Sequence, residues 1–295
     1  MKVILRPCRY LIGGLHMKKV RIGIVGAGNI ATNAHMPAYK VCDQAEIAAV
    51  ADLNLERAQA FAEKFGISHA YGSVEEMLAN EDIDAVDICT WNCGHAPVAI
   101  AAAKAGKHIL CEKPFADSLE HAREAKEAIE KAGVTFLLGV PSRFNPPNAL
   151  ARKMLDDGEL GDIYYAKTSY LRRRGTPTGW FTDSRVSGGG PVLDIGVHRI
   201  DAAWYLMGNP KPVRVSSAVA NHLGEYETKG ITRWQGTPCP DNQNNTEDFG
   251  AGVIHFENGA LLAFEAAWAL NGPDYQATQL FGTKGGITLD PLTLY

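Results

Sequence analysis

The chain has 295 residues, enough for one large or two ordinary domains, and its 46% apolar and 21% charged residues are typical of a globular protein. The net charge of −4 and the lack of a basic block argue against nucleic acid as a partner. No apolar run approaches the length needed to cross a bilayer, which argues against a membrane protein.

The N-terminal half alternates strand-like and helix-like segments. Residues 1–16 are expected to form an extension or a disordered arm, because Arg6 and Arg9 interrupt their apolar stretch. Beyond them, apolar runs predict buried strands at 20–25, 47–51, 85–89, 108–111 and 134–139. The sequence also predicts helices over 55–65 and 118–132, each followed by a glycine. This alternation predicts a parallel sheet covered by helices on both faces.

The C-terminal half has a different pattern. Helices are expected near 149–155 and over 193–207, and strands at 163–171, 213–220, 249–256, 260–268 and 275–281. Residues 221–246 are polar and rich in Gly, Pro and Asn, which predicts a long loop. We therefore predict an α/β chain of two domains, a dinucleotide-binding domain at 17–142 and an α+β domain with an open, mostly antiparallel sheet at 143–295.

The six cysteines lie at positions 8, 42, 89, 93, 111 and 239 and show no zinc-type spacing, so no metal site is expected. Cys89 and Cys111 fall in apolar runs typical of buried strands, which predicts buried thiols. Because the spacing indicates no disulfides, the composition fits a reducing, cytoplasmic location.

A glycine-rich loop follows the first predicted strand. Gly26 would permit a tight turn, Gly28 would let the backbone approach a pyrophosphate, and Ala31 stands in the place of a third glycine. Asn29 and Ile30 lie within the same loop and belong to the predicted cofactor site. Such a motif alone is more often a structural turn, but here a strand precedes it and a helix follows.

Asp52 ends the second predicted strand, about twenty residues after the glycine loop, and this spacing favours a dinucleotide site. Its carboxylate would accept hydrogen bonds from the adenosine ribose and repel a 2′-phosphate, so the expected cofactor is NAD rather than NADP. Arg57 weakens this interpretation, since its side chain would reach a phosphate. A capping role at the following helix is the alternative for Asp52.

Two further motifs carry chemistry. Glu112-Lys113-Pro114 lies at the carboxyl end of a predicted parallel strand, the edge where open α/β sheets bind ligands, although such a triplet is usually a solvated turn. Asp194 and His198 are four residues apart on a predicted helix and would project from one face. Taken alone, they would be a capping aspartate and a histidine that is only hydrogen-bonded.

Taken together, the glycine loop, Asp52, Glu112-Lys113-Pro114 and the stretch from Gly188 to His198 resemble the Gfo/Idh/MocA oxidoreductases. That family takes its name from glucose–fructose oxidoreductase, inositol dehydrogenase and a rhizopine-catabolism protein. The likeness covers nearly everything from residue 17 onward, and these further segments match: Thr90 to His95, Arg143-Phe144, Glu247-Asp248-Phe249 and Lys284-Gly285-Gly286.

The resemblance implies a Rossmann domain followed by an open-sheet domain, with a nicotinamide at the seam and a sugar, cyclitol or derivative as substrate. It places the family's lysine, aspartate and histidine on Lys113, Asp194 and His198. It also implies a set of cofactor residues, Thr90, Asn92, His95, Glu112 and Lys113, and adds Arg143 to the substrate residues.

The chain departs from the family pattern in two places. Trp91 stands where many relatives carry proline, and the chain stops at Tyr295 where relatives continue, which suggests a shortened C-terminus. Trp180 precedes the glycine run and is expected either to stack on a sugar face or to be a core tryptophan.

These observations predict an NAD-dependent dehydrogenase, or a reductase in the opposite direction, for a secondary alcohol of a sugar or cyclitol. His198 would remove the hydroxyl proton, Lys113 would stabilise the developing negative charge, and Asp194 would orient His198 or the substrate. Two alternatives stay open, a glycosidase that uses NAD transiently and a non-catalytic nucleotide-binding regulator. A homodimer or homotetramer through the free face of the second sheet is expected.

Overall fold

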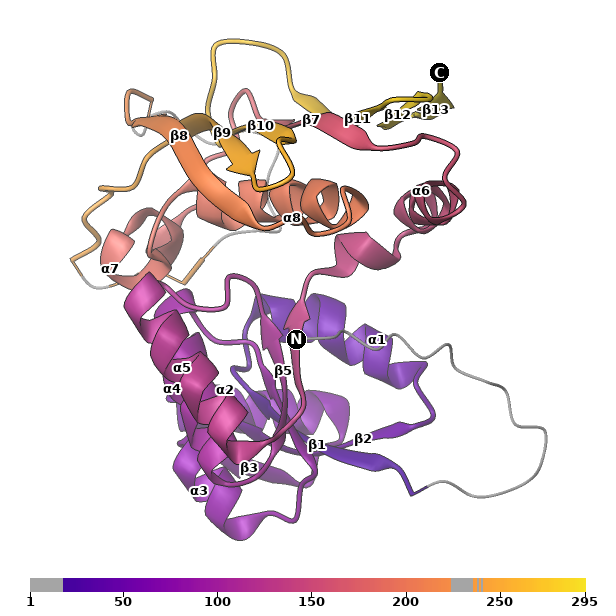
Figure 1. Ribbon diagram of the computed structural model, residues 1–295. Coiled ribbons are helices and arrows are strands. Elements are labelled where there is room, and N and C mark those ends of the chain that lie inside the picture. The colour runs from indigo at the N-terminus through magenta and orange to yellow at the C-terminus, as the bar shows by residue number, and fades with distance from the viewer. Residues whose placement is uncertain (1–17, 224–235, 238, 240) are drawn as a thin grey trace.

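The computed structural model describes residues 18–223, 236–237, 239 and 241–295 and contains two sheets, one in each half of the chain (Figure 1). The expected arm at 1–16 lies outside the described residues, as does most of the predicted loop at 221–246. Cys89 and Cys111 are buried free thiols, as the sequence predicted. No helix in the described part of the chain is both long enough and apolar enough to span a bilayer.

The N-terminal half is a doubly covered parallel sheet. Its elements are β1 (Val20–Val25), η1 (Ala31–His35), α1 (Met36–Lys40), β2 (Ala45–Ala51), α2 (Leu55–Phe65), β3 (His69–Tyr71), α3 (Val74–Asn80), β4 (Ala85–Ile88), α4 (Asn92–Lys104), β5 (His108–Glu112), α5 (Leu119–Ala132) and β6 (Phe136–Gly139). The strands follow the order β3-β2-β1-β4-β5-β6 and every neighbouring pair is parallel. This is the strand order of a Rossmann fold, which confirms the predicted architecture.

Alternate residues of β2 show how both faces of this sheet are buried. Ala49 and Ala51 belong to one apolar cluster with Met77, whereas Val50 belongs to a second cluster with Phe61. Successive side chains of a strand point to opposite faces, so the two clusters lie on opposite sides of the sheet.

Local signals end the helices where the sequence placed them. The Asn54 side chain accepts a hydrogen bond from the Arg57 amide at 2.9 Å, which caps α2, and Gly66 closes the helix with a φ of 70°. Ser118 caps α5 in the same way, and Gly133 closes it with a φ of 66°. Both glycines adopt the left-handed conformation that favours glycine.

The C-terminal half is built on a seven-stranded mixed sheet. Its elements are η2 (Pro141–Phe144), α6 (Pro146–Asp156), β7 (Ile163–Leu171), η3 (Gly179–Thr182), α7 (Ser184–Ser187), η4 (Val192–Gly196), α8 (Val197–Leu206), β8 (Pro212–Ala220), β9 (Phe249–Phe256), β10 (Leu261–Ala267), β11 (Tyr275–Gly282), β12 (Gly286–Leu289) and β13 (Leu292–Leu294). The strand order is β13-β12-β11-β7-β10-β9-β8. Within this second sheet only β7 and β10 pair in parallel among the described strands, so the predicted mostly antiparallel sheet is confirmed.

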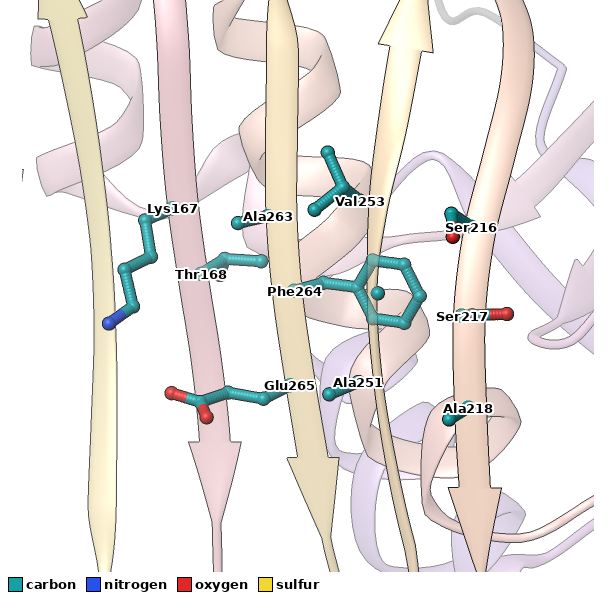
Figure 2. Close-up of a pocket in the computed structure, with 11 residues that line it drawn as sticks. Lys167, Thr168, Ser216, Ser217, Ala218, Ala251, Val253, Ala263, Phe264 and Glu265 are labelled. Carbon is teal, nitrogen blue, oxygen red and sulfur yellow. The ribbon is translucent and has the colours of Figure 1, made fainter.

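The two faces of this second sheet differ. Helices α6 and α8 cover one face, and their apolar side chains form a core with Leu262 and Leu280 (Figure 1). The opposite face carries no helix within the described residues. It bears a shallow cavity of about 510 Å³ that crosses β7, β8, β9 and β10, with Lys167 and Glu265 at one side (Figure 2).

Several elements were missing from the sequence-based prediction, among them three short strands and helix α4. Strands β3, β12 and β13 have three or four residues each, too few for an alternating pattern. Helix α4 is rich in alanine and buries residues around most of its circumference, and it contains Pro97, so it shows neither an apolar stripe nor a clean boundary. It packs against α5 and supports the strand ends that carry the site.

Candidate functional site

The glycine loop brings the chain unusually close to the end of β4. Gly26 has a φ of 99°, and a Cβ added there would lie 2.5 Å from the Cys89 carbonyl oxygen. Gly28, by contrast, has open space where a Cβ would be. The first glycine is therefore needed for the turn, and the second leaves the backbone accessible to a ligand.

A cavity of about 260 Å³ opens at this loop and is walled by both halves of the chain. The loop residues Ala27, Gly28, Asn29 and Ile30 form one wall, and Thr90 and Trp91 lie at the end of β4. The second half contributes Trp180, Phe181, Gly236 and Thr237. A glycine cradle at the carboxyl ends of parallel strands, with an acid at the end of β2, fits a dinucleotide.

Asp52 lies at the end of β2, as predicted, but its carboxylate is fully engaged. One oxygen accepts from the Ala27 amide at 2.9 Å and from Arg57 Nε at 3.0 Å. The other accepts from the Asn54 amide at 2.8 Å and from Arg57 Nη2 at 2.6 Å. The four acceptor positions of a carboxylate are thus filled, and ribose hydroxyls would have to displace Arg57 to reach it.

Two of the predicted cofactor residues bind protein atoms instead of facing the cavity. The ring nitrogens of His95 lie 2.6 Å from the Pro114 carbonyl oxygen and 3.1 Å from that of Thr90, and burial lowers the pKa of this histidine. Asn92 donates to the Ser187 carbonyl oxygen at 2.7 Å. Within the described chain, His95 connects the loops after β4 and β5, and Asn92 connects the two halves.

Lys113 reaches across the seam to Asp194. Its Nζ donates to the Asp194 backbone oxygen at 2.8 Å and to Oδ1 at 2.9 Å. The second carboxylate oxygen accepts from Trp268 Nε1 at 3.0 Å. Burial tends to raise the pKa of Asp194, but the charge and hydrogen bond of Lys113 and the Trp268 N–H together hold it below its usual range.

His198 lies four residues after Asp194, at the start of α8, in a different electrostatic setting. Burial and the nearby Lys113 charge lower its pKa to about 4, against the opposing influence of Asp194. Its ring makes no hydrogen bond to any protein atom in the described part of the chain. The imidazole is therefore neutral at pH 7, and its acceptor nitrogen is free to take a proton.

A second cavity, of about 280 Å³, adjoins His198 and is lined by Ser142, Asn145, Asn148, Tyr170, Arg199 and Asp290 among others. Such a set offers hydroxyl, amide, guanidinium and carboxylate groups around one aromatic ring. Two guanidinium groups lie near the Tyr170 ring, that of Arg172 at 5.0 Å and that of Arg199 at 5.6 Å from the ring centroid.

Two predicted substrate residues have partners in the protein. Arg143 Nε donates to Asp201 at 2.7 Å, and its guanidinium lies 5.2 Å from the Tyr205 ring centroid. Trp180 is buried and stacked, with ring centroids 6.3 Å from Trp91 and 4.0 Å from Phe181. Trp180 is thus a packed tryptophan, and it lines the cavity at the glycine loop.

The glycine run before Asp194 allows close contact between backbones. A Cβ on Gly188 would lie 2.3 Å from the Asp117 carbonyl oxygen of the N-terminal half, and one on Gly190 would lie 2.1 Å from that of Glu247. A side chain at Gly188 would collide with the N-terminal half, so this glycine is needed where the segment that carries Asp194 meets that half. Gly190 is needed for packing within the C-terminal half.

Sequence reasoning missed several residues that contact the site. Trp268 binds Asp194 from a position 74 residues further along the chain, where it reads as an ordinary strand tryptophan. Asp87, an acid inside an apolar strand run, and His35, shortly after the glycine loop, form a buried pair behind Glu112. The sequence did contain one signal for this pair, because Asp87 is a charged residue inside a predicted buried strand.

Comparisons with known proteins agree with this arrangement. A family model described as an oxidoreductase family with an NAD-binding Rossmann fold matches residues 20–140, and one for the GFO/IDH/MocA C-terminal domain matches residues 149–288. The chain is 34% identical over 281 residues to the D-glucoside 3-dehydrogenase of Escherichia coli, covering 94% of this chain and 78% of that protein. It is 30% identical to the levoglucosan dehydrogenase of Pseudarthrobacter phenanthrenivorans, covering 93% and 74%.

Solved structures give the same result. Levoglucosan dehydrogenase in complex with NADH and L-sorbose superposes with a TM-score of 0.78 at 28% identity, covering 92% of this chain and 73% of that one. The aldose-aldose oxidoreductase of Caulobacter crescentus has a TM-score of 0.76 at 29% identity, covering 92% and 76%. With both halves matched and the lysine, aspartate and histidine brought to one seam, this chain belongs to the Gfo/Idh/MocA family of oxidoreductases.

Proposed function

We propose that this chain is an NAD-dependent dehydrogenase that oxidises a secondary alcohol of a sugar, cyclitol or sugar derivative, or reduces the matching ketone. The observation that carries the proposal is the Lys113 ammonium bound to Asp194, with the neutral His198 one helical turn further on. An acid–base pair of this kind suits proton removal from an alcohol. Bound NAD supplies the hydride acceptor.

The roles of the three residues follow from their contacts. A lysine ammonium has three donors, and Asp194 uses two of them, so one remains for the substrate oxygen. That donor stabilises the negative charge which develops as the hydroxyl loses its proton. His198 accepts the proton, since its acceptor nitrogen is neutral and unengaged among the described residues.

The role of Asp194 is more specific than the sequence suggested. Its carboxylate oxygens bind Lys113 and Trp268, not His198. We propose that Asp194 orients the Lys113 ammonium and stabilises its positive charge, and that it does not orient the histidine. Trp268 holds the Asp194 carboxylate in place.

For the cofactor we propose NAD in preference to NADP. A carboxylate at the end of β2 favours ribose hydroxyls and repels a 2′-phosphate. The pairing of Arg57 with Asp52 reduces this preference, because the displaced guanidinium would lie near any phosphate at that position. We also propose that Thr90 and Glu112 contribute to the cofactor site.

For the substrate we propose a neutral sugar or cyclitol bound in the cavity beside His198. Its polar lining suits several hydroxyl groups, and the Tyr170 ring offers an apolar surface to a sugar face. The similar proteins include the D-glucoside 3-dehydrogenase of Escherichia coli and the myo-inositol 2-dehydrogenase of Thermotoga maritima, which supports this class of substrate.

A screen of polyols, sugars and glycosides with NAD, followed by NADH absorbance, tests the proposal. Reduction of NAD by one substrate class is the expected result, and Lys113→Ala should abolish it. Release of an aglycone without net NADH would assign the chain to the glycosidase alternative instead. Tight cofactor binding with no turnover on any class would favour a nucleotide-binding regulator.

We further propose a homodimer or homotetramer that pairs the helix-free faces of two second sheets, with the domain boundary at residues 142/143 and a cytoplasmic location. The support for this assembly is the face of the second sheet that no helix of the described chain covers and that bears the shallow cavity. A monomer in light scattering at micromolar concentration would refute this assembly.

A further inference from the structure

His35 occupies a position that the proposed chemistry does not use. It is the last residue of η1, the helical turn that follows the glycine loop, and its side chain is only 11% exposed. Its Nδ1 lies 2.7 Å from Asp87 Oδ2 and its Nε2 lies 2.9 Å from Glu112 Oε1. Only an imidazolium can donate from both ring nitrogens, so His35 is a buried cation between two carboxylates.

The charges around His35 agree with that assignment. Burial alone would lower its pKa, but the hydrogen bonds and charges of Asp87 and Glu112 raise it to about 10. Asp87 is fully buried on β4 and also accepts from the Tyr39 hydroxyl at 2.9 Å and the Cys89 thiol at 3.7 Å. Two carboxylates in this interior require a cation, and His35 is the one that touches both.

Glu112 connects His35 to Lys113 through hydrogen bonds of its two carboxylate oxygens. Its Oε1 accepts from His35, and its Oε2 accepts from the Lys113 backbone amide at 3.1 Å. A Cβ on Gly139 would lie 3.3 Å from Oε1, so β6 packs closely on the carboxylate. Asp87, His35, Glu112, Lys113 and Asp194 thus form a chain of alternating charge from the sheet interior to the seam.

Three groups of this cluster, His35, Asp87 and Cys89, bring possible ligand atoms within 4.8 Å of one another. A metal would need a deprotonated ring nitrogen and a thiolate. Both nitrogens of His35 face carboxylates as donors, and burial raises the pKa of the Cys89 thiol. The contacts are those of a hydrogen-bond network.

We propose that His35 is a positioning residue for Lys113, which holds the Glu112 carboxylate against the Lys113 amide and so fixes the path of the lysine to Asp194 and the substrate oxygen. The proposal rests on the function proposed above for Lys113. The turn η1 begins at the glycine loop, and its last residue, His35, binds Glu112 at the end of β5. The imidazole of His35 therefore connects the glycine loop to the strand end that carries Lys113.

The test compares His35→Leu, which removes both donors, with His35→Gln, which keeps one. His121→Leu is the matched control, because His121 also pairs with a carboxylate, Asp117, at 2.6 Å but on the surface. On the best substrate of the wild type, kcat per cofactor-binding site should fall about tenfold or more in His35→Leu and less in His35→Gln. The dissociation constant for NADH should change little, and His121→Leu should match the wild type.

A second measurement does not depend on turnover. Trace acetylation of lysines, followed by mass spectrometry, reports how accessible each amine is. In His35→Leu the labelling of Lys113 should rise severalfold relative to the exposed Lys126, whereas general loosening of the fold would raise both. If His35→Leu does not fold, the same comparison of kcat per site and of Lys113 labelling is made between His35→Gln and the wild type.

Unchanged kcat per site with unchanged Lys113 labelling would overturn the proposal. A wild type that oxidises no sugar would remove the proposed function, and the labelling comparison would still decide whether His35 positions Lys113.

Discussion

The two histidines at the starts of the two functional helices share a local structure and have opposite electrostatics. His35 ends the π-helical turn η1, and His198 follows the π-helical turn η4 by two residues. The pKa of His35 is raised to about 10, and that of His198 is lowered to about 4. Both rings are mostly buried, so burial alone does not explain the difference.

Hydrogen-bond partners explain it. Two carboxylates lie within 2.9 Å of the His35 ring nitrogens, whereas the strongest charged influence on His198 is the cation Lys113. A histidine with two acidic partners is a fixed charge, and one beside a cation is a neutral acceptor. The same side chain therefore serves as structure in the first half and as a candidate base in the second.

The strongest test of this contrast is the loss of catalysis at His198. We expect His198→Ala to lower kcat by at least about 10²-fold, within the range for general acid–base groups, with little change in thermal stability or NADH affinity. Steady-state kinetics with the best substrate, a melting curve and a fluorescence titration measure the three quantities. Near-normal turnover would leave Lys113 as the candidate base.

Stability is the complementary test, and here His35 should have the larger effect. Removing one partner of a buried ion pair costs about 3–5 kcal/mol, so His35→Leu should unfold at a much lower denaturant concentration than wild type. The carboxylates of Asp87 and Glu112 would then be buried without a cation. His198→Leu should lose nothing comparable, because its ring makes no hydrogen bond among the described residues.

The pH dependence of that stability difference has a defined sign. The folded pKa of His35, about 10, lies above its ordinary value of 6.5. Its contribution is therefore complete below pH 6.5 and is lost as pH rises through about 10. The gap between wild type and His35→Leu should narrow over that window. Burial raises the pKa of the Tyr39 hydroxyl and of the Cys89 thiol, which face the same cluster, so both stay protonated while His35 titrates. A gap that widens with pH would contradict a charged His35.

The pH profile of turnover tests the other half of the comparison, the neutral state of His198. Because its pKa is lowered to about 4, the ring stays neutral well below pH 6.5. We expect kcat/KM for oxidation to stay level from about pH 7 to about pH 5 and to fall below that. An acidic limb at 6.5 would mean that His198 gains an acidic partner when the cofactor binds.

The smallest expected effect concerns cofactor choice in the first half. Asp52→Ser should narrow or invert a preference for NAD, because Arg57 then loses its carboxylate partner and is free to meet a 2′-phosphate. The ratio of kcat/KM for the two cofactors measures this. Asp52→Ser combined with Arg57→Ala should lose the gain for NADP. A wild type that prefers NADP by about tenfold, or 1.4 kcal/mol, would refute the assignment of Asp52.

The sequence predicted what local chemistry decides. Gly66 and Gly133 end their helices through contacts within a few residues, and the structure has them where the sequence predicted. The motifs at strand ends were also recognisable, since their function depends on the edge of the sheet at which they stand. The meeting of Lys113 with Asp194, 81 residues apart, was inferred from the family pattern and is present in the structure.

What escaped prediction depends on partners far along the chain. His35 acquires its charge from Asp87 and Glu112, which are 52 and 77 residues away. Asp194 was expected to orient His198 or the substrate, and in the structure its carboxylate binds Lys113 and Trp268. The pairing of Arg143 with Asp201 was also not predicted. A sequence shows which side chains are charged, but it does not show which of them form pairs.

The strand order of the second sheet has a consequence for how the protein is made. Strand β7 is synthesised first but lies in the middle of its sheet, where Tyr165 pairs with Leu261 and Leu171 with Tyr275. In the first sheet, Val20 pairs with Ala45 and Ile22 with Ala85. Loops that close over longer stretches form more slowly. We expect a growing chain to complete its nucleotide fold early and to assemble the lysine–aspartate seam only when Trp268 has left the ribosome.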